Sequence, residues 1–258
     1  MNELLNLAIK AHGGLERWRP VRSLQAKVTL NGTLWRIKGR PNGLPGVLMR
    51  ADTRQPALTM TPFPSPGSVG HFTPDRVWIE GENHKLVSEL NKPRDSFTGA
   101  VLTTKWNELQ ELYFTGYAFW NYFTAPFLLA QPGVEVEEIE PHKEDGETWR
   151  PLSVIFPPEI PTHSAHQTFY FNDKGLLQRH DYATDVAGGV ASHYCFDHVT
   201  FDDIVVPTFR RVVPRRTDGP VIHGPTAVLV EHWDVIQDEA TQEQSKSGVP
   251  IFGDTFGR

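Results

Sequence analysis

The residues best equipped for chemistry lie in one polar stretch, RHDYATDVAGGVASHYCFDH, at positions 179–198. These twenty residues include three histidines, three aspartates and two tyrosines. Gly188-Gly189 is typical of a two-residue hairpin turn, which pairs positions whose numbers sum to 377. That register directs four candidate side chains to one face of the hairpin: His180, Asp197, His193 and Tyr182.

These four side chains would suit acid–base catalysis. A histidine beside an aspartate, as His180 would lie beside Asp197, is held in one tautomer and exchanges protons near neutral pH. A tyrosine hydroxyl, such as that of Tyr182 or Tyr194, can donate to a developing oxyanion. Such an enzyme would hydrolyse, isomerise or cyclise an apolar substrate. Cross-strand hydrogen bonds without a catalytic role are the alternative, because buried polar groups on sheets are normally paired.

His180, His193 and Asp197 would also form a ligand set of two histidines and one carboxylate, which suits zinc or non-haem iron. The segment His163-Ser164-Ala165-His166 adds donors in a loop before the preceding predicted strand. The spacing does not match an HExxH or a repeated CxxC motif. We therefore predict no cofactor, with zinc or iron at these three residues as the lesser alternative.

Other catalytic classes are disfavoured. The single cysteine, Cys195, excludes an internal disulfide and is more typical of a small buried apolar residue than of a nucleophile. GxSxG, GxxxxGK and GxGxxG motifs are absent, which disfavours serine hydrolases, P-loop NTPases and Rossmann oxidoreductases. Lys plus Arg is 25 and Asp plus Glu is 31, so the net charge is 25 − 31 = −6. This balance predicts no nucleic-acid partner, because phosphate binding needs a positive field.

The N-terminal residues MNELLNLAIKAHGG lack the features of a signal peptide. Glu3 lies where basic residues are expected, and the apolar run is too short. No stretch approaches the roughly 20 apolar residues of a membrane span. These observations predict a soluble, cytoplasmic protein without membrane insertion, and they leave the oligomeric state open.

A mainly β framework must position these side chains. Apolar residues recur every three or four positions over 3–18, which predicts an N-terminal helix interrupted at Gly13-Gly14. From Leu24 the apolar period is two, which predicts a hairpin turning at Asn31-Gly32 or one long bent strand. Short strands follow on both sides of a central aromatic segment. We predict two parts of the chain: one domain over residues 1–236 and a polar tail over 237–258.

Residues 105–130 interrupt the β pattern. Nine of the 22 residues from Trp106 to Phe127 are aromatic, at helical spacing. A helix that is apolar nearly all round must be clamped between two apolar surfaces or cover a cavity. Pro126 should kink or end this helix.

The element order and three phrases resemble a known superfamily: AHGGLERWRPVRSL at 11–24, THSAHQTFYFNDKGLLQRHDY at 162–182 and FDDIVVPTFRRVVPR at 201–215. Together they resemble an uncharacterised bacterial group similar to the LolA/LppX-like lipoprotein carriers. The resemblance implies a single curved, incomplete antiparallel β-barrel, with an N-terminal helix and the aromatic helix on its concave side and an apolar cavity between. Those carriers are exported, so the predicted cytoplasmic location argues against lipoprotein transport.

The favoured hypothesis is therefore a binding protein whose partner is a small apolar or aromatic molecule, held in the barrel under the aromatic helix. Apolar walls with a few polar groups are typical of small-molecule pockets. Six aromatic residues are the predicted ligand contacts: Trp35, Trp78, Tyr113, Tyr117, Trp120 and Phe123. The enzyme that uses the polar hairpin in the same cavity remains the alternative.

Overall fold

The structure is a computed structural model, and it describes residues 2–216, 221–222 and 224–239. Its α-helices are α1 (Glu3–Ala11), α2 (Leu15–Trp18), α3 (Thr33–Ile37) and α4 (Glu108–Thr124). Short 3-10 helices are η1 (Glu82–His84), η2 (Pro93–Phe97) and η3 (Phe127–Ala130). Within the described residues, no helix combines the length and the hydropathy that crossing a membrane requires.

The strands divide into two runs on either side of α4. The first run is β1 (Val21–Asn31), β2 (Leu44–Asp52), β3 (Leu58–Thr61), β4 (Val69–Phe72), β5 (Arg76–Glu80) and β6 (Leu86–Asn91). The second run is β7 (Glu135–Glu138), β8 (His142–Glu144), β9 (Glu147–Ile155), β10 (His166–Phe171), β11 (Leu177–Ala183), β12 (Val190–Phe201), β13 (Ile204–Arg215) and β14 (Val228–Glu239).

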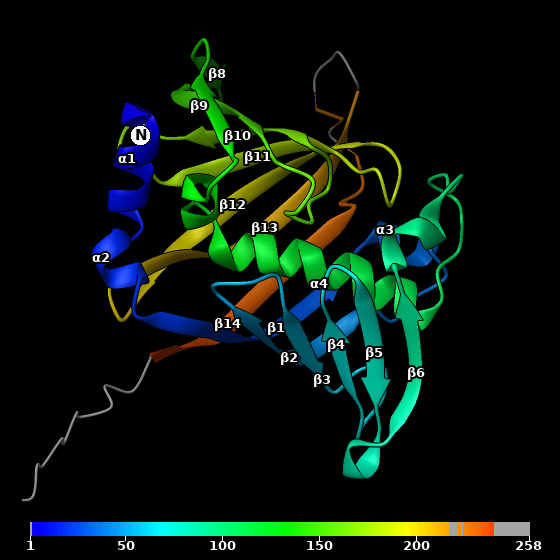
Figure 1. The fold of residues 1–258 in the computed structure, drawn as a ribbon. Coiled ribbons are helices and arrows are strands. Elements are labelled where there is room, and N and C mark those ends of the chain that lie inside the picture. The colour runs from blue at the N-terminus through cyan, green and yellow to red at the C-terminus, as the bar shows by residue number, and fades with distance from the viewer. Residues whose placement is uncertain (1, 217–220, 223, 240–258) are drawn as a thin grey trace, which may run out of the picture.

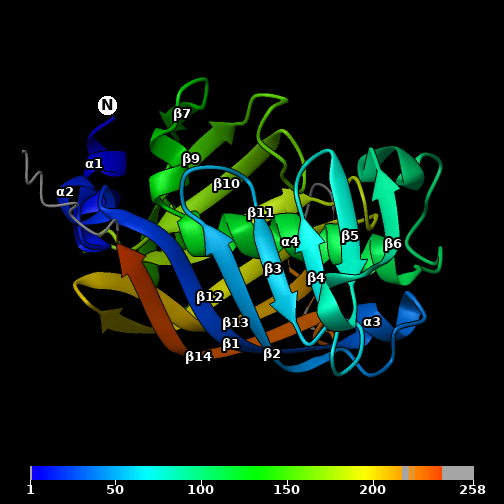
Figure 2. The same ribbon diagram turned by 60° about the horizontal axis from the view of Figure 1, so that its bottom comes forward.

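These strands form one antiparallel sheet of 14 strands. Its order is β6-β5-β4-β3-β2-β1-β14-β13-β12-β11-β10-β9-β7, with β8 paired to β9 off this path. The sheet curls around α4 (Figures 1 and 2), and the edge strands β6 and β7 do not pair with each other among the described residues. The predicted curved, incomplete β-barrel with helices on its concave side is confirmed.

Helix α4 begins at a capping box, in which Asn107 and Gln110 bond to each other's backbone N–H groups. Fourteen of its 17 residues are buried, because the two strand runs enclose it. At Gly116 a Cβ atom would lie 2.4 Å from Cγ of Phe72, so only glycine lets the helix approach β4 this closely. The helix ends at Thr124, ahead of Pro126 as predicted.

The predicted strand or hairpin around Asn31-Gly32 is wrong: β1 ends there and α3 follows. The reason is a tertiary contact with the residues just before β14. Thr33 and Leu34 donate their backbone N–H groups to the carbonyl groups of Thr226 and Ala227, at 3.1 and 3.0 Å. The one-turn helix that results places Trp35 in the core, where it is 1% exposed.

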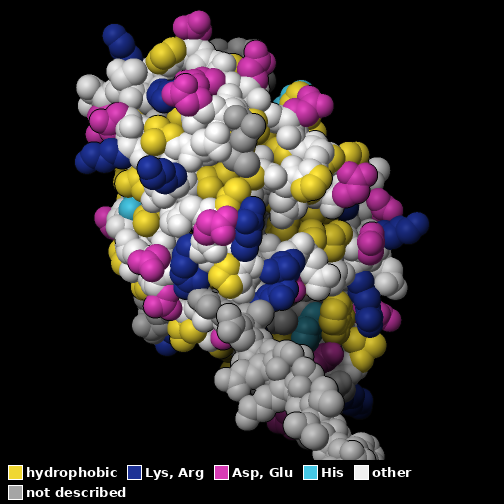
Figure 3. Space-filling view, turned by 60° about the vertical axis from the view of Figure 1, so that its left-hand side comes forward, with side chains coloured by type: hydrophobic (Ala, Val, Ile, Leu, Met, Phe, Trp, Pro, Cys, Tyr) yellow, Lys and Arg dark blue, Asp and Glu magenta, His cyan; other side chains and the backbone are white. Residues whose placement is uncertain are grey.

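The described residues do not test the division into two parts. Strand β14 continues through Glu239, and residues 240–258, most of the predicted polar tail, lie outside the described residues. The predicted break of the N-terminal helix at Gly13-Gly14 matches the end of α1 and the start of α2. On the side of the molecule that carries α1 and α2, basic and acidic side chains are interspersed (Figure 3).

Candidate ligand cavity and its polar surroundings

A cavity of about 270 Å³ lies between α4 and the concave face of the sheet. Helix α4 lines it with Phe114, Ala118 and Phe119, and the opposite walls include Leu30, Trp35 and Val212. These lining side chains are apolar and come from elements far apart in the sequence. The cavity is therefore a product of the fold.

The cavity has an exposed mouth and a buried wall. At the mouth, Leu102 is 44% exposed, and Gly189 is also exposed. Deeper in, the wall includes Tyr122 and Tyr182, which are 8% and 5% exposed. Arg215, at the end of β13, is the one charged residue among the described residues that line the cavity.

Behind the deep wall, His163 joins three tyrosines from α4 and β11. The Tyr122 hydroxyl lies 2.9 Å from His163 Nε2 and 3.3 Å from the Tyr182 hydroxyl, and the Tyr117 hydroxyl lies 3.1 Å from His163 Nδ1. The His163 ring also stacks on Tyr182, with ring centroids 4.0 Å apart. Both ring nitrogens of His163 are thus hydrogen-bonded inside the protein.

Burial keeps this cluster neutral. Desolvation, together with the positive charge of Arg94, lowers the pKa of His163 to about 3. Desolvation raises the pKa of Tyr122 to about 12 and that of Tyr182 well above its ordinary value. None of these groups therefore changes its protonation state near neutral pH.

The hairpin register differs from the predicted one: His180 pairs with His193, and the paired numbers sum to 373. The connection is longer than the predicted two residues because Thr184 and Gly188 bond across it, with Gly188 N–H donating to the Thr184 carbonyl at 2.7 Å. The shift is four residues, an even number, so His180, Tyr182 and His193 still face α4. His180 Nε2 donates to Gln167 Oε1 at 2.5 Å.

Asp197 does not join the two histidines. Its side chain is exposed and its backbone is left-handed, with φ 52°, farther along β12 than the buried part of the hairpin. The set of two histidines and one carboxylate is therefore not assembled. Across the residues that the structure describes, no group of three or more His, Cys, Asp or Glu side chains is arranged to hold a metal ion.

The predicted ligand contacts are dispersed. Trp35 lines the cavity. Tyr113 lines a separate hollow beside Arg94, and Tyr117 bonds to His163. Trp120 donates its indole N–H to the Asp52 carbonyl at 2.8 Å.

Two further predicted contacts lie away from the cavity. Phe123 is buried, with its ring 5.9 Å from that of Phe119. Trp78 stacks on His71 at 4.6 Å, on the opposite face of β5 from buried Val77. Helical spacing identified α4 as the covering helix, but could not identify which of its sides borders the empty space.

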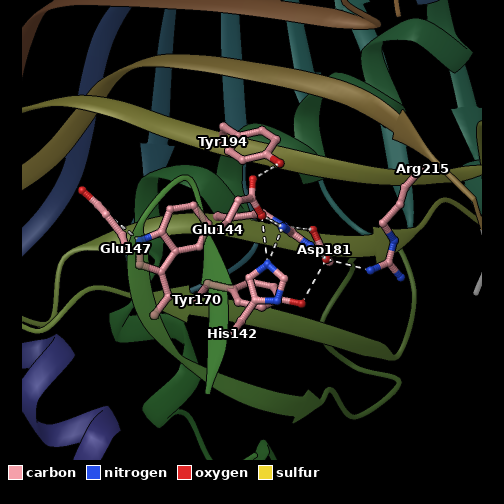
Figure 4. A network of polar contacts seen from close by, with 9 residues as sticks. His142, Glu144, Glu147, Tyr170, Asp181, Tyr194 and Arg215 are labelled. Carbon is pink, nitrogen blue, oxygen red and sulfur yellow. Dashed lines mark hydrogen bonds and ion pairs between the residues drawn. The ribbon is translucent and has the colours of Figure 1, made fainter. Parts of the chain in front are cut away.

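A charged network on the outer face of the same strands was not predicted (Figure 4). Arg179 donates two hydrogen bonds to Asp181, at 2.7 and 2.6 Å, and also pairs with Glu144. Asp181 accepts a third bond from Arg215 at 2.9 Å, and Tyr194 donates to Glu144 at 2.5 Å. Glu144 comes from β8, and its distance along the chain explains why no local pattern revealed the network.

Comparisons with known proteins identify structures that share this fold. Neither a protein-family model nor a curated protein matches the chain. A LolA superfamily protein from Nitrosomonas europaea has a TM-score of 0.53 at 9% identity, covering 92% of this chain and 93% of its own. A DUF1329 family protein from Desulfovibrio piger has a TM-score of 0.53 at 12% identity, covering 91% and 92%. A putative outer membrane lipoprotein-sorting protein domain from Vibrio parahaemolyticus has a TM-score of 0.50 at 11% identity, covering 94% and 96%.

The comparison also corrects the predicted location. The cytoplasmic prediction is wrong, because the structures that share the fold include a putative outer membrane lipoprotein-sorting protein domain. The prediction depended on N-terminal residues that form α1, and their composition reflects its packing, with Leu4 and Leu5 buried. The resemblance read from the sequence is confirmed: this chain has the LolA-like fold.

Proposed function

We propose that the protein binds a small apolar or aromatic molecule in the cavity between α4 and the sheet. The observation that carries the proposal is the cavity itself, about 270 Å³ of space with predominantly apolar walls. Protein interiors normally contain few voids larger than a water molecule. An apolar space of this size is costly to leave empty and favourable to fill with an apolar ligand.

The volume limits the size of the ligand. An apolar cavity of roughly 150 Å³ holds one benzene molecule. A space of about 270 Å³ therefore suits roughly ten to twelve carbon atoms, as a short alkyl chain or a two-ring aromatic. One structure that shares the fold is a putative lipoprotein-sorting domain, and the acyl chains of lipoproteins are ligands of the same apolar kind.

The enzymatic alternative has less support. Tyr122 and Tyr182 do reach the cavity wall, with His163 behind them. A general acid or base works best when its pKa lies near the working pH. The pKa of His163 is about 3 and that of Tyr122 about 12, so neither is matched to proton transfer at neutral pH.

The test is to fill the cavity from α4 by replacing Ala118, which lines it, with leucine. The added carbon atoms would take up ligand space. At about 0.8 kcal/mol for each displaced CH₂ group, 1-decanol should bind roughly 50-fold more weakly to A118L, as measured by isothermal titration calorimetry. Native mass spectrometry of the wild-type protein should show one bound decanol.

The matched control is Ala8→Leu in α1, where the alanine is 0% exposed and away from the cavity. Overpacking there should cost about 1–3 kcal/mol of stability without changing decanol affinity. Ala118→Leu should cost less, because the space already exists. Decanol affinity that is equal in A118L and wild type, or undetectable in wild type, would refute the proposed site.

A further inference from the structure

We propose that the rim of the cavity mouth is a docking surface for an anionic lipid bilayer. The rim comprises the segments that line the cavity near its mouth or bond to lining residues, namely 98–105, 184–190, 211–216, 221–222 and 224–228. The inference goes beyond the proposed ligand site, because the bilayer contacts the rim and not the cavity. Docking places the mouth against the lipid, so an apolar molecule passes between bilayer and cavity without crossing water.

Exposed apolar side chains come from two segments of the rim. Leu102 lines the cavity, and its neighbour Val101 is 59% exposed. Ile222 is 42% exposed, and its backbone N–H donates to the carbonyl of Pro214, another lining residue, at 2.9 Å. Single exposed apolar side chains are normal on a protein surface, but a group of them at one opening indicates contact with an apolar partner.

The fold holds Val101 and Leu102 in this exposed position. Buried Lys38 donates from Nζ to the carbonyl groups of Val101 and Ala187, at 3.2 and 2.7 Å. Gly188 packs so closely that a Cβ atom there would lie 2.9 Å from the backbone nitrogen of Leu102. Two segments of the rim are thus joined, and the apolar side chains are ordered before any partner arrives. A surface that is ordered in advance loses less conformational freedom when it binds.

The rim carries more positive than negative charge. The one acidic residue in its segments is Asp185, which pairs with Arg94 at 3.0 Å. The charge of Arg215 is compensated by Asp181, at 2.9 Å. The remaining charged residues of the rim are all basic: Lys105, Arg211 and Arg216.

These three basic side chains are exposed, and none of them forms an ion pair among the described residues. Lys105 donates to the Ile37 carbonyl at 2.6 Å, and Arg211 donates to the Thr226 hydroxyl at 3.0 Å. Arg216 directly follows the last residue of β13. The chain as a whole has a net charge of −6, so this basic rim is the side that an anionic bilayer attracts. The apolar side chains then bury area among the lipid headgroups.

The experiment measures co-sedimentation of the full chain with vesicles of phosphatidylglycerol and phosphatidylcholine in equal parts, and with vesicles of phosphatidylcholine alone. The wild-type protein should bind the anionic vesicles at least about tenfold more tightly, and added salt should weaken this binding. Val101→Asp should weaken it at least about tenfold, because an apolar contact is lost and a negative charge is added at the rim. Arg216→Gln should weaken binding to the anionic vesicles about fivefold.

Val87→Asp is the matched control, because Val87 is 63% exposed on the edge strand β6 and lies outside the rim. It adds the same charge and should leave vesicle binding unchanged. Equal losses in the two aspartate variants would show that net charge governs binding, which overturns the inference. Failure of the wild-type protein to bind vesicles, or equal binding to both kinds, would also overturn it.

Two further measurements separate docking from other roles of the rim. Decanol affinity should be the same in V101D and wild type, because Val101 does not line the cavity. A loss of both decanol and vesicle binding in V101D would show damage to the cavity and overturn the assignment of Val101 to a docking surface. In size-exclusion chromatography the wild-type protein and V101D should elute together. A wild-type dimer that V101D dissociates would assign the rim to a second copy of the chain, which overturns the inference.

Discussion

The two faces of β10, β11 and β12 differ in the kind of polar residue that they bury: neutral groups on one face and ion pairs on the other. The inner face, toward α4, carries buried His180, Tyr182 and His193, and burial lowers the pKa of His180 and raises that of Tyr182, so both of these are neutral. The outer face carries Arg179 and Asp181, which form ion pairs at 4% side-chain exposure each (Figure 4). Neighbouring residues of one strand thus belong to a neutral environment and a charged one.

The difference follows from what covers each face. The inner face borders α4 and an apolar cavity, where an ion would lose its hydration without a partner. On the outer face, Glu144 of β8 supplies a second carboxylate, so two arginines meet two acids in the network. The neutral groups on the inner face of these three strands suit a cavity for apolar molecules, although Arg210 of neighbouring β13 is buried against Tyr122 of α4. The charged outer face fixes the strands behind it. Arg215 belongs to this network through Asp181, and it is also among the residues that line the cavity.

The largest effect should come from breaking the outer network at Asp181. Asp181→Ala leaves Arg179 and Arg215 without their shared carboxylate, and removing one partner of a buried ion pair costs about 3–5 kcal/mol. Urea unfolding measures this loss. Asp185→Ala is the control, since Asp185 pairs with Arg94 at the surface, where such pairs contribute about 0–1 kcal/mol. Similar losses in both variants would contradict the distinction between the network and the surface.

The next effect tests the neutrality of the inner cluster through pH. The pKa of His163 is about 3 in the folded protein and 6.5 in the unfolded chain. Between these two pH values the unfolded chain therefore binds more protons than the folded protein. Its contribution to stability is complete above pH 6.5 and is lost as the pH falls toward 3. At pH 5 this loss amounts to about 2 kcal/mol.

His163→Gln should therefore flatten the decline of stability between pH 7 and pH 5, measured by urea unfolding at each pH. Glutamine can still bond to the tyrosines but takes up no proton. His180 and His12 also have lowered pKa values, so part of the decline should remain. His166→Gln, at an exposed position at the start of β10, should keep the wild-type slope. An unchanged slope in H163Q would show that His163 is not the buried neutral base described here.

These features differ in how far the sequence could reveal them. The strands and α4 were predictable because strand alternation and aromatic helical spacing are local signals, whereas the curvature of the sheet was implied only by the family resemblance. The residues of the hairpin that face inward were also predictable, because the observed register differs from the predicted one by an even number of residues. The register itself was not, because the longer connection closed by Thr184 and Gly188 also bonds to a distant segment, with the Asp185 N–H donating to the His163 carbonyl.

The candidate site was predictable only in part for the same reason. Tyr182 and Trp35 do line the cavity, but Asp197 turns outward at a left-handed residue. The cavity itself is formed by four or more separate elements. Contacts of this kind leave no periodic signal in the sequence.

The smallest effect compares one tyrosine from each face. Tyr182→Phe removes an inner hydroxyl whose bond to Tyr122 is neutral and 3.3 Å long, and should cost about 0.5–1.5 kcal/mol. Tyr194→Phe removes an outer hydroxyl that donates to the Glu144 carboxylate at 2.5 Å, and should cost about 1.5–3 kcal/mol. Because Tyr182 lines the cavity, only its replacement should alter decanol binding, making it slightly tighter as the wall becomes more apolar. Urea unfolding and calorimetry of both variants measure these differences. A larger stability loss at Tyr182 than at Tyr194 would place the stronger polar contacts on the inner face and reverse the comparison between the two faces.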